Sequence, residues 1–210
     1  MRLVILGATG GIGRLVVEQA VKAGHEVTAV VRDPSALTVP GADVRTANAL
    51  DPAVLTPIVE GADAVVSALG VRPPIKGPVS LQSSGATSAL KAMEATGVRR
   101  YLMVSAAGAF YEKADDLVTR LIAKPLLNRI LRYSFDDTRD AEKIVGASPV
   151  DWTIARPPRL TDKPRTGRYR IGDDRGLKRP FTISRADVAD FLIRSIENPD
   201  TFRRAVVIAN

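Results

Sequence analysis

Short apolar runs alternate with segments of helical periodicity along almost the whole chain. The candidate strands are residues 2–6, 26–31, 43–46, 63–68, 101–105, 151–155 and 205–209. Helical spacing of apolar positions covers residues 11–23, 52–60, 81–96, 113–122, 134–147 and 185–197. Runs such as AVVSAL and YLMVSA lack polar alternation, which is typical of parallel strands covered on both faces. The pattern therefore predicts an α/β fold, a Rossmann-like doubly wound parallel sheet flanked by helices.

Three segments interrupt this alternation and leave from the ends of predicted strands. They are residues 70–80, 109–133 and 156–184. Ligands of open α/β sheets bind at the carboxyl ends of the strands, so we expect these segments to form the substrate side of one domain spanning residues 1–210. The last of them is a small C-terminal excursion. Within 109–133, the apolar helical stretch from 117 onward is interrupted by Pro125; we expect it to pack in the core, with a substrate lid or partner surface as alternatives.

A glycine-rich turn follows the first predicted strand and precedes the first helix. Gly7, Gly10 and Gly13 recur at every third position in GATGGIGR. The first allows a tight turn, the second a close approach to a phosphate, and the third close packing of helix on sheet. The exposed N–H groups of the segment Thr9, Gly10, Gly11 and Ile12, with the positive end of the helix dipole, suit a pyrophosphate. This context predicts a dinucleotide site.

The end of the second predicted strand indicates which dinucleotide is bound. Arg32 occupies the position where an acid would bind the ribose 2′-hydroxyl of NAD, and a guanidinium there can pair with a 2′-phosphate. Asp33 follows it, and Arg14 is a second candidate partner for the phosphate. We therefore predict NADP(H) in preference to NAD(H). Further contacts are expected from residues after the third and fourth strands, namely Asn48 and Ala49 at the adenine and Leu69 and Gly70 at the ribose and pyrophosphate.

Composition narrows the classes of partner. The net charge of +7 lies entirely within residues 156–185, which indicates attraction of an anionic ligand. Aromatic residues are too sparse there for base stacking, which disfavours nucleic acid. The chain has no cysteine, no apolar run long enough to span a membrane, no secretory signal and no cluster with metal-ligand spacing. We expect a cytoplasmic protein without a metal or a membrane contact.

Five motifs together resemble a known family. They are GATGGIGR, VVRDPS, DWTIARPPRLTD, TGRYRIG and ISRADVADFL. They are similar to the atypical short-chain dehydrogenase/reductases, within them to the NAD(P)H-binding NmrA-like proteins and the nearby biliverdin-IXβ and flavin reductases. The resemblance implies NADPH, Ser105 beside the nicotinamide, Pro157 and Pro158 along its carboxamide side, and Arg72 over cofactor or substrate. It also suggests a monomer, leaving a dimer open.

The chain departs from the short-chain dehydrogenases in its proton-transfer residues. These enzymes use a Tyr-x-x-x-Lys pair, but here the four tyrosines are followed at that spacing by Ser105, Asp115, Asp137 and Asp173. Alcohol–ketone chemistry is therefore disfavoured. Hydride transfer to a conjugated acceptor, such as a flavin, quinone or linear tetrapyrrole, needs mainly placement.

For that reaction we expect Ser105 as a weak catalytic candidate. The predicted substrate contacts are Arg72, Ala107, Tyr111, Pro158 and Arg159, with the two arginines facing an anionic acceptor. The alternative function is a non-enzymatic NADP(H) sensor, which would also lack the Tyr-Lys pair. An isomerase or lyase using NADP transiently is disfavoured, because sugar epimerases keep that pair.

Overall fold

The computed structural model describes residues 1–71, 75–172, 176–178 and 180–210. Its centre is an eight-stranded sheet in the order β3-β2-β1-β4-β5-β6-β10-β8, and all neighbouring strands pair in parallel except β8. The strands are β1 (Arg2–Leu6), β2 (Glu26–Val31), β3 (Ala42–Thr46), β4 (Ala64–Ser67), β5 (Arg100–Val104), β6 (Asp151–Arg156), β10 (Arg204–Ala209) and β8 (Arg170–Ile171). A separate parallel pair joins β7 (Arg159–Thr161) to β9 (Thr182–Ser184). The predicted fold class is confirmed.

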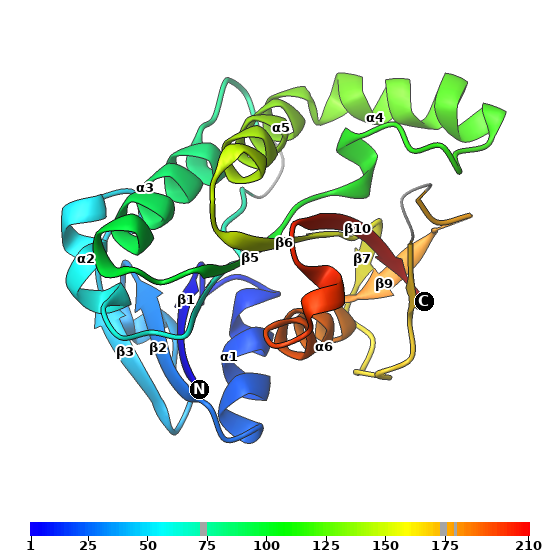
Figure 1. The fold of residues 1–210 in the computed structure, drawn as a ribbon. Helices are drawn as coiled ribbons and strands as arrows, with labels where there is room; N and C mark the ends of the chain where they lie inside the picture. Colours follow the sequence, from blue (N-terminus) through cyan, green and yellow to red (C-terminus); the bar gives the residue numbers. More distant parts are fainter. Residues whose placement is uncertain (72–74, 173–175, 179) are drawn as a thin grey trace.

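Helices cover both faces of the sheet (Figure 1). One face carries α1 (Gly13–Lys22) and α6 (Arg185–Ser195); the other carries α2 (Pro52–Val59), α3 (Leu81–Thr96) and α5 (Arg132–Ala147). Because strand side chains alternate between faces, the sheet divides the core into two apolar clusters, one under each helical layer. In the part of the chain that the structure describes, no helix combines the length and apolar character needed to cross a bilayer.

The strand order reverses between β1 and β4. The chain first moves outward through β2 and β3, then returns to place β4 on the other side of β1. The connections after β1 and β4 therefore diverge at the carboxyl edge of the sheet and leave a crevice between them. This is the position where doubly wound sheets bind ligands.

The predicted helix over residues 113–122 is wrong in its bounds. The structure has a π-helical turn, Thr119–Ala123, followed by α4 (Lys124–Ile130), and residues 113–116 are not helical. Pro125 does not interrupt this helix. Residues 117–123 before it are already helical, and the π-helical turn Thr119–Ala123 ends just before Pro125, so its missing N–H falls where the hydrogen-bond register of the helix changes.

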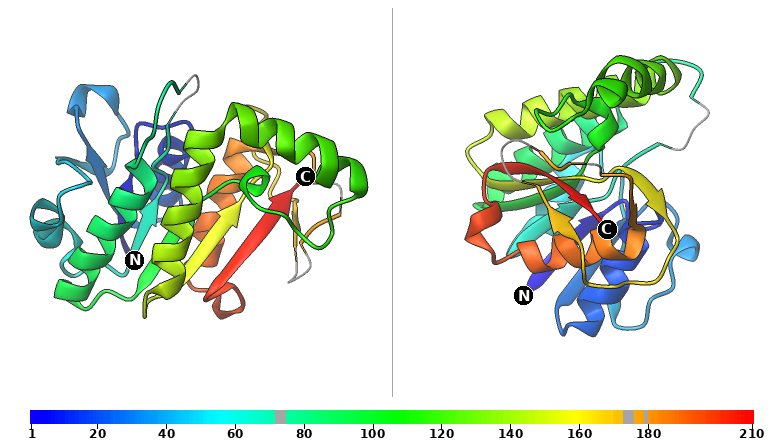
Figure 2. Two further views of the ribbon diagram at one scale, coloured as in Figure 1. Left: turned by 90° about the horizontal axis from the view of Figure 1, so that it is seen from above. Right: turned by 90° about the vertical axis from the view of Figure 1, so that its right-hand side faces the viewer.

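The expectation that this apolar stretch packs in the core is also wrong. Leu117, Leu121 and Ile130 are 74%, 68% and 67% exposed. Figures 1 and 2 show α4 at the periphery, on the α5 side of the sheet. Its inward anchor is the buried Lys124 ammonium, which pairs with the buried Asp115 carboxylate. Sequence periodicity identified an apolar helix but could not show that much of its apolar surface is exposed.

Side-chain caps fix the helix that follows the basic segment. The Ser184 hydroxyl accepts a hydrogen bond from the Asp187 amide at 2.9 Å, as in a capping box. The Asp187 carboxylate does not accept from the Ser184 amide, which donates to Asn210 Oδ1 at 3.1 Å. It accepts from the amides of Thr166 and Gly167, both at 2.8 Å, and from the Asn210 side chain at 3.0 Å. Asp187 thus ties the 156–184 excursion and the C-terminus to the start of α6.

Candidate functional site

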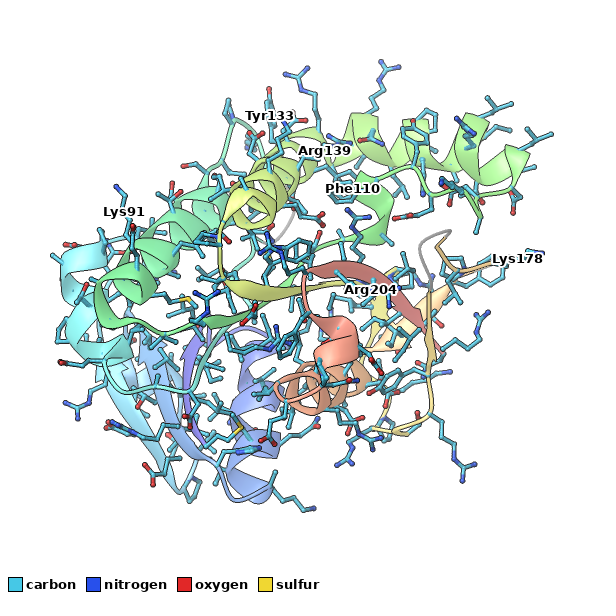
Figure 3. All side chains as sticks on the ribbon, viewed as in Figure 1. Lys91, Phe110, Tyr133, Arg139, Lys178 and Arg204 are labelled. Atoms are coloured by element: carbon cyan, nitrogen blue, oxygen red, sulfur yellow. The ribbon has the colours of Figure 1, made fainter. Side chains whose placement is uncertain are left out.

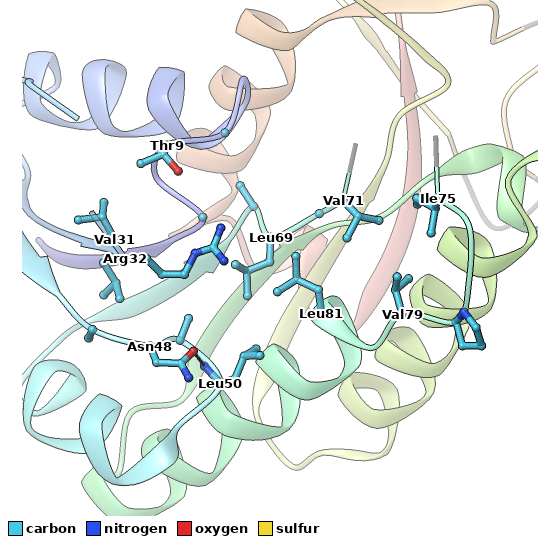
Figure 4. A pocket seen from close by; sticks show the side chains of 18 of the residues that line it. Thr9, Val31, Arg32, Asn48, Leu50, Leu69, Val71, Ile75, Val79 and Leu81 are labelled. Carbon is cyan, nitrogen blue, oxygen red and sulfur yellow. Dashed lines mark hydrogen bonds between the residues drawn. The ribbon is translucent and has the colours of Figure 1, made fainter. Parts of the chain in front are cut away.

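A cavity of about 980 Å³ opens at the carboxyl edge of the sheet, where the strand order reverses (Figure 4). The segments that follow β1, β2, β3 and β4 form its walls. Eight of the predicted cofactor residues line it: Gly7, Thr9, Gly10, Arg32, Asn48, Ala49, Leu69 and Gly70. The structure thus brings together residues spread over more than sixty positions of sequence.

The glycine turn has the compact geometry that the motif predicts. Gly7 adopts a φ of +75°, and a Cβ built on it would lie 2.7 Å from the backbone of Ala68. A Cβ on Gly13 would lie 2.1 Å from the Gly7 carbonyl oxygen, so any side chain there would separate helix α1 from the strand–helix turn. The Gly10 amide donates to that same oxygen at 2.9 Å.

The start of α1 has features that suit an anion. Its N-cap position, Ile12, supplies no side-chain hydrogen bond, and its first turn contains no acidic residue. The amides there are thus left without side-chain acceptors, and the helix dipole makes this end positive. With the side-chain-free cradle of the glycine turn, these residues fit the pyrophosphate of a dinucleotide.

Arg32 and Asp33 have different environments. The Arg32 side chain lines the cavity (Figure 4). The Asp33 carboxylate accepts hydrogen bonds from the hydroxyl and the amide of Ser35, at 2.7 and 2.9 Å, and caps the short 3₁₀ helix Pro34–Ala36. Both bonds lower the pKa of Asp33, and the bond from the hydroxyl has the larger effect. The acid is therefore occupied by its own loop, while the cation faces the cavity.

The predicted nicotinamide side lies at the ends of β5 and β6. The Ser105 amide donates to Ala155 O at 2.8 Å, and the Ala107 amide donates to Pro157 O at 2.9 Å. The two strands are thereby held together past their regular ends. Ser105 is buried, and its hydroxyl donates to the carboxylate of Glu142 on α5. Because its hydroxyl hydrogen is directed at Glu142, Ser105 can accept a hydrogen bond from a ligand but cannot donate one to it.

Glu142 belongs to a buried charge network. Arg156, the last residue of β6, donates to Glu142 through Nε at 3.0 Å and Nη2 at 2.6 Å, and to Glu112 through Nη1 at 2.8 Å. Its guanidinium also lies 3.8 Å from the centre of the Phe110 ring. Burial alone would lower the pKa of Arg156, but the bonds and charges of Glu142 and Glu112 raise it above its usual value. The network fixes the segment after β5 against β6 and α5. Phe110, which lies in that segment, is labelled in Figure 3.

The remaining predicted residues in the described part of the chain lie outside the 980 Å³ cavity. Gly11, Ile12 and Gly13 form the turn and start of α1, whereas Ser105, Ala107, Pro157 and Pro158 follow β5 and β6. Tyr111 is 53% exposed, with Lys124 Nζ 5.8 Å from its ring centre, and Arg159 begins β7 with its side chain exposed. Arg72 lies outside the described residues.

Sequence reasoning missed several residues of the site. Lys76 lines the cavity from the proline-rich segment, in which it is a cation among apolar residues and glycines. Glu142 and Arg156 were also missed. The sequence did contain a sign of each residue: Glu142 is a charged residue next to Ala141 on the buried face of a helix, and Arg156 is a charged residue at the end of a buried strand. Only the fold shows that the two pair with each other.

Two of the four tyrosines are buried in the core or hydrogen-bonded to another residue. Tyr101 is fully buried in the core, and burial raises its pKa to about 12. Tyr169 donates to Asp190 at 2.9 Å, and burial, followed by this bond, raises the pKa of Tyr169 further above its usual value. Asp137, at the lysine position relative to Tyr133, accepts hydrogen bonds from the first amides of α3 instead. Among the described residues, no three His, Asp or Glu side chains gather where they could hold a metal ion.

Comparisons with known proteins agree with this geometry. Residues 7–199 match the family model described as NAD(P)H-binding. The uncharacterized sugar epimerase YhfK of Bacillus subtilis is 30% identical over 98% of this chain and 92% of its own. A proposed NADH-flavin reductase from Streptococcus pneumoniae has a TM-score of 0.81 and 26% identity, covering 100% of this chain and 99% of its own.

A short-chain dehydrogenase/reductase from Veillonella parvula, solved in complex with NADP, has a TM-score of 0.79. It is 18% identical and covers 100% of this chain and 94% of its own, and this likeness concerns the fold alone.

Proposed function

The chain belongs to the NAD(P)H-binding family, and from this premise we propose that it is an NADPH-dependent oxidoreductase acting on a conjugated acceptor. Membership confirms the family expected from the motifs. The observation that carries the proposal is the cavity at the strand-order reversal, which combines the glycine turn with Arg32. The reductase name of the pneumococcal protein supports the reaction class.

The preference for NADPH rests on Arg32 and Asp33. An acid facing the cavity would bind the ribose 2′-hydroxyl of NADH and repel a 2′-phosphate. Here Asp33 is bonded to Ser35, and Arg32 faces the cavity. Lys76, in the segment after β4, adds a second cation to the cavity lining. The cavity thus presents positive charge where the phosphate would lie.

Bound NADPH supplies a hydride. The chain would supply placement: the glycine turn would hold the pyrophosphate, and the ends of β5 and β6 would form the wall at the nicotinamide. The Ser105 hydroxyl is directed to Glu142, which in turn is held by Arg156. Both oxygens of the Glu142 carboxylate accept hydrogen bonds from Arg156, and one also accepts from Ser105, so this carboxylate is held within the network. We therefore favour an acceptor whose conjugated system takes the hydride and receives its proton from solvent. Flavins, quinones and linear tetrapyrroles have this property.

The first test is a binding titration with NADPH and NADH. Wild-type protein should bind NADPH more tightly. Arg32→Ala should lower NADPH affinity about tenfold or more, as expected for a charged hydrogen bond, and leave NADH nearly unchanged. Arg2→Ala is the matched control, because Arg2 is an exposed arginine at the opposite edge of the sheet. Equal loss of both nucleotides in Arg32→Ala would show that Arg32 stacks on adenine and does not read the phosphate.

The second test is turnover. NADPH oxidation is followed at 340 nm with FMN, riboflavin and a short-chain quinone. Consumption with one of these acceptors supports the reductase. Tight binding of both redox forms without consumption by any acceptor would favour the alternative, an NADP(H) sensor that acts through a partner protein.

A further inference from the structure

The start of α6 lies beside the glycine turn that precedes α1. The Gln19 side chain on α1 donates to Ala186 O, in the first turn of α6, at 2.9 Å. Ser184 caps α6 and Arg185 is its first residue. The side chain that α6 directs at the glycine turn is therefore a cation.

The Arg185 side chain passes directly over Gly11. A Cβ built on Gly11 would lie 3.0 Å from Arg185 Cδ and 3.1 Å from its Nε. A Cβ at position 11 would require the Arg185 side chain to shift by a few tenths of an ångström. Gly11 therefore leaves room for Arg185 close against the turn, a feature that the three-glycine spacing does not express.

The partner of Arg185 is a weak competitor. Its Nη1 lies 2.6 Å from Asp162 Oδ1, but the Asp162 side chain is 87% exposed and that of Arg185 is 30% exposed. Ion pairs with one carboxylate in open solvent contribute little, and salt screens them. A pyrophosphate offers a denser negative charge and several oxygens in the geometry that a guanidinium prefers.

We propose that Arg185 is a pyrophosphate-binding residue, held over the glycine turn by Asp162 until the dinucleotide replaces that carboxylate. The proposal rests on the proposed function, since it assumes that the turn holds a dinucleotide. It adds a side-chain cation to a site otherwise built from backbone amides. It also assigns Asp162 the role of a competing anion that lowers cofactor affinity.

The test compares three ligands that share the pyrophosphate: NADPH, NADH and ADP-ribose. Calorimetric titration of Arg185→Gln should show affinity lowered about tenfold to a hundredfold for all three, the range expected for hydrogen bonds to a charged group. Arg32→Ala should weaken NADPH only. Asp162→Asn should keep or tighten binding of all three ligands.

Several results would overturn the proposal. Arg185→Gln could bind all three ligands within twofold of wild type, or lose only NADPH, which would assign Arg185 to the 2′-phosphate. Asp162→Asn could lose as much affinity as Arg185→Gln, which would make the ion pair a structural support. Thermal melting of each variant distinguishes a loss of ligand affinity from misfolding. Arg185→Lys, which keeps the charge, should retain part of the affinity if the protein is folded. If wild-type protein binds none of the three ligands, the proposed function itself fails.

Discussion

The buried network around Arg156 gives the sharpest prediction about stability. Glu142 and Arg156 join α5 to the end of β6, and their side chains are 7% and 17% exposed. The perturbation is a double-mutant cycle of Glu142→Leu, Arg156→Met and the two together. Each replacement has a similar volume to the residue it removes, so the cycle changes charge more than packing.

The magnitude follows from which charges remain unpaired. Removing one partner of a buried ion pair costs about 3–5 kcal/mol. Glu142→Leu should fall at the lower end, about 3 kcal/mol, because Glu112 still pairs with Arg156 at 2.8 Å. Arg156→Met should lower the free energy of unfolding by about 5 kcal/mol, the upper end of this range. It leaves the buried Glu142 carboxylate with the hydrogen bond from Ser105 but without the guanidinium. The double variant replaces the pair by apolar side chains and should cost less than the sum by at least about 1 kcal/mol.

The assay is urea unfolding at pH 7 of all four proteins without cofactor, followed by circular dichroism. The slopes should agree, so that differences in midpoint report differences in stability. A coupling energy below about 0.5 kcal/mol, the scatter of independent sites, would refute the reasoning. It would mean that water or Glu112 alone satisfies Arg156, and that the network does not hold the segment after β5.

Three further predictions test other contacts. Asp137→Ala should destabilise the protein by about 2–3 kcal/mol in urea unfolding, because its carboxylate accepts from two amides and a hydroxyl at the start of α3; an effect below 0.5 kcal/mol would contradict this. Gly13→Ala should lower the melting temperature and weaken NADPH binding, whereas Gly146→Ala on α5, where a Cβ meets nothing within 4 Å, should change neither; equal behaviour of the two would contradict the close approach at Gly13. Burial alone would raise the pKa of Asp187, but hydrogen bonds from Asn210, Gly167, Thr166 and Ser184 hold it below its usual value. Its stabilising effect should therefore be fully present above about pH 4 and be lost as the pH falls below that, so the stability difference between wild type and Asp187→Ala should shrink between pH 7 and pH 3; a constant difference would contradict the assigned bonds.

Much of the fold follows from local pattern. All seven predicted strands are present. Unbroken apolar runs such as AVVSAL can be buried only on both faces of a sheet, whereas the edge strand β3, with sequence ADVRT, is partly exposed. The short strands β7, β8 and β9 were not predicted. They have two or three residues each, too few for a hydrophobic period, and tertiary contacts define them.

Most residues of the candidate cofactor site could also be predicted from local pattern. The glycine turn and Arg32 lie at strand ends, and parallel strands bring their carboxyl ends to one edge of the sheet. What the sequence could not show is where each charge is directed. Asp33 and Arg32 are adjacent in the chain, yet only the hydrogen bonds to Ser35 separate their roles.

The sequence by itself determined the α/β alternation, the parallel sheet and the glycine turn, because periodicity and backbone freedom are properties of neighbouring residues. Only the tertiary structure decided that Glu142 meets Arg156, that Arg185 crosses Gly11 and that the helix through Pro125 lies exposed. Charge pairing and burial depend on distances across the fold, and residues far apart in the chain leave no local pattern that records them.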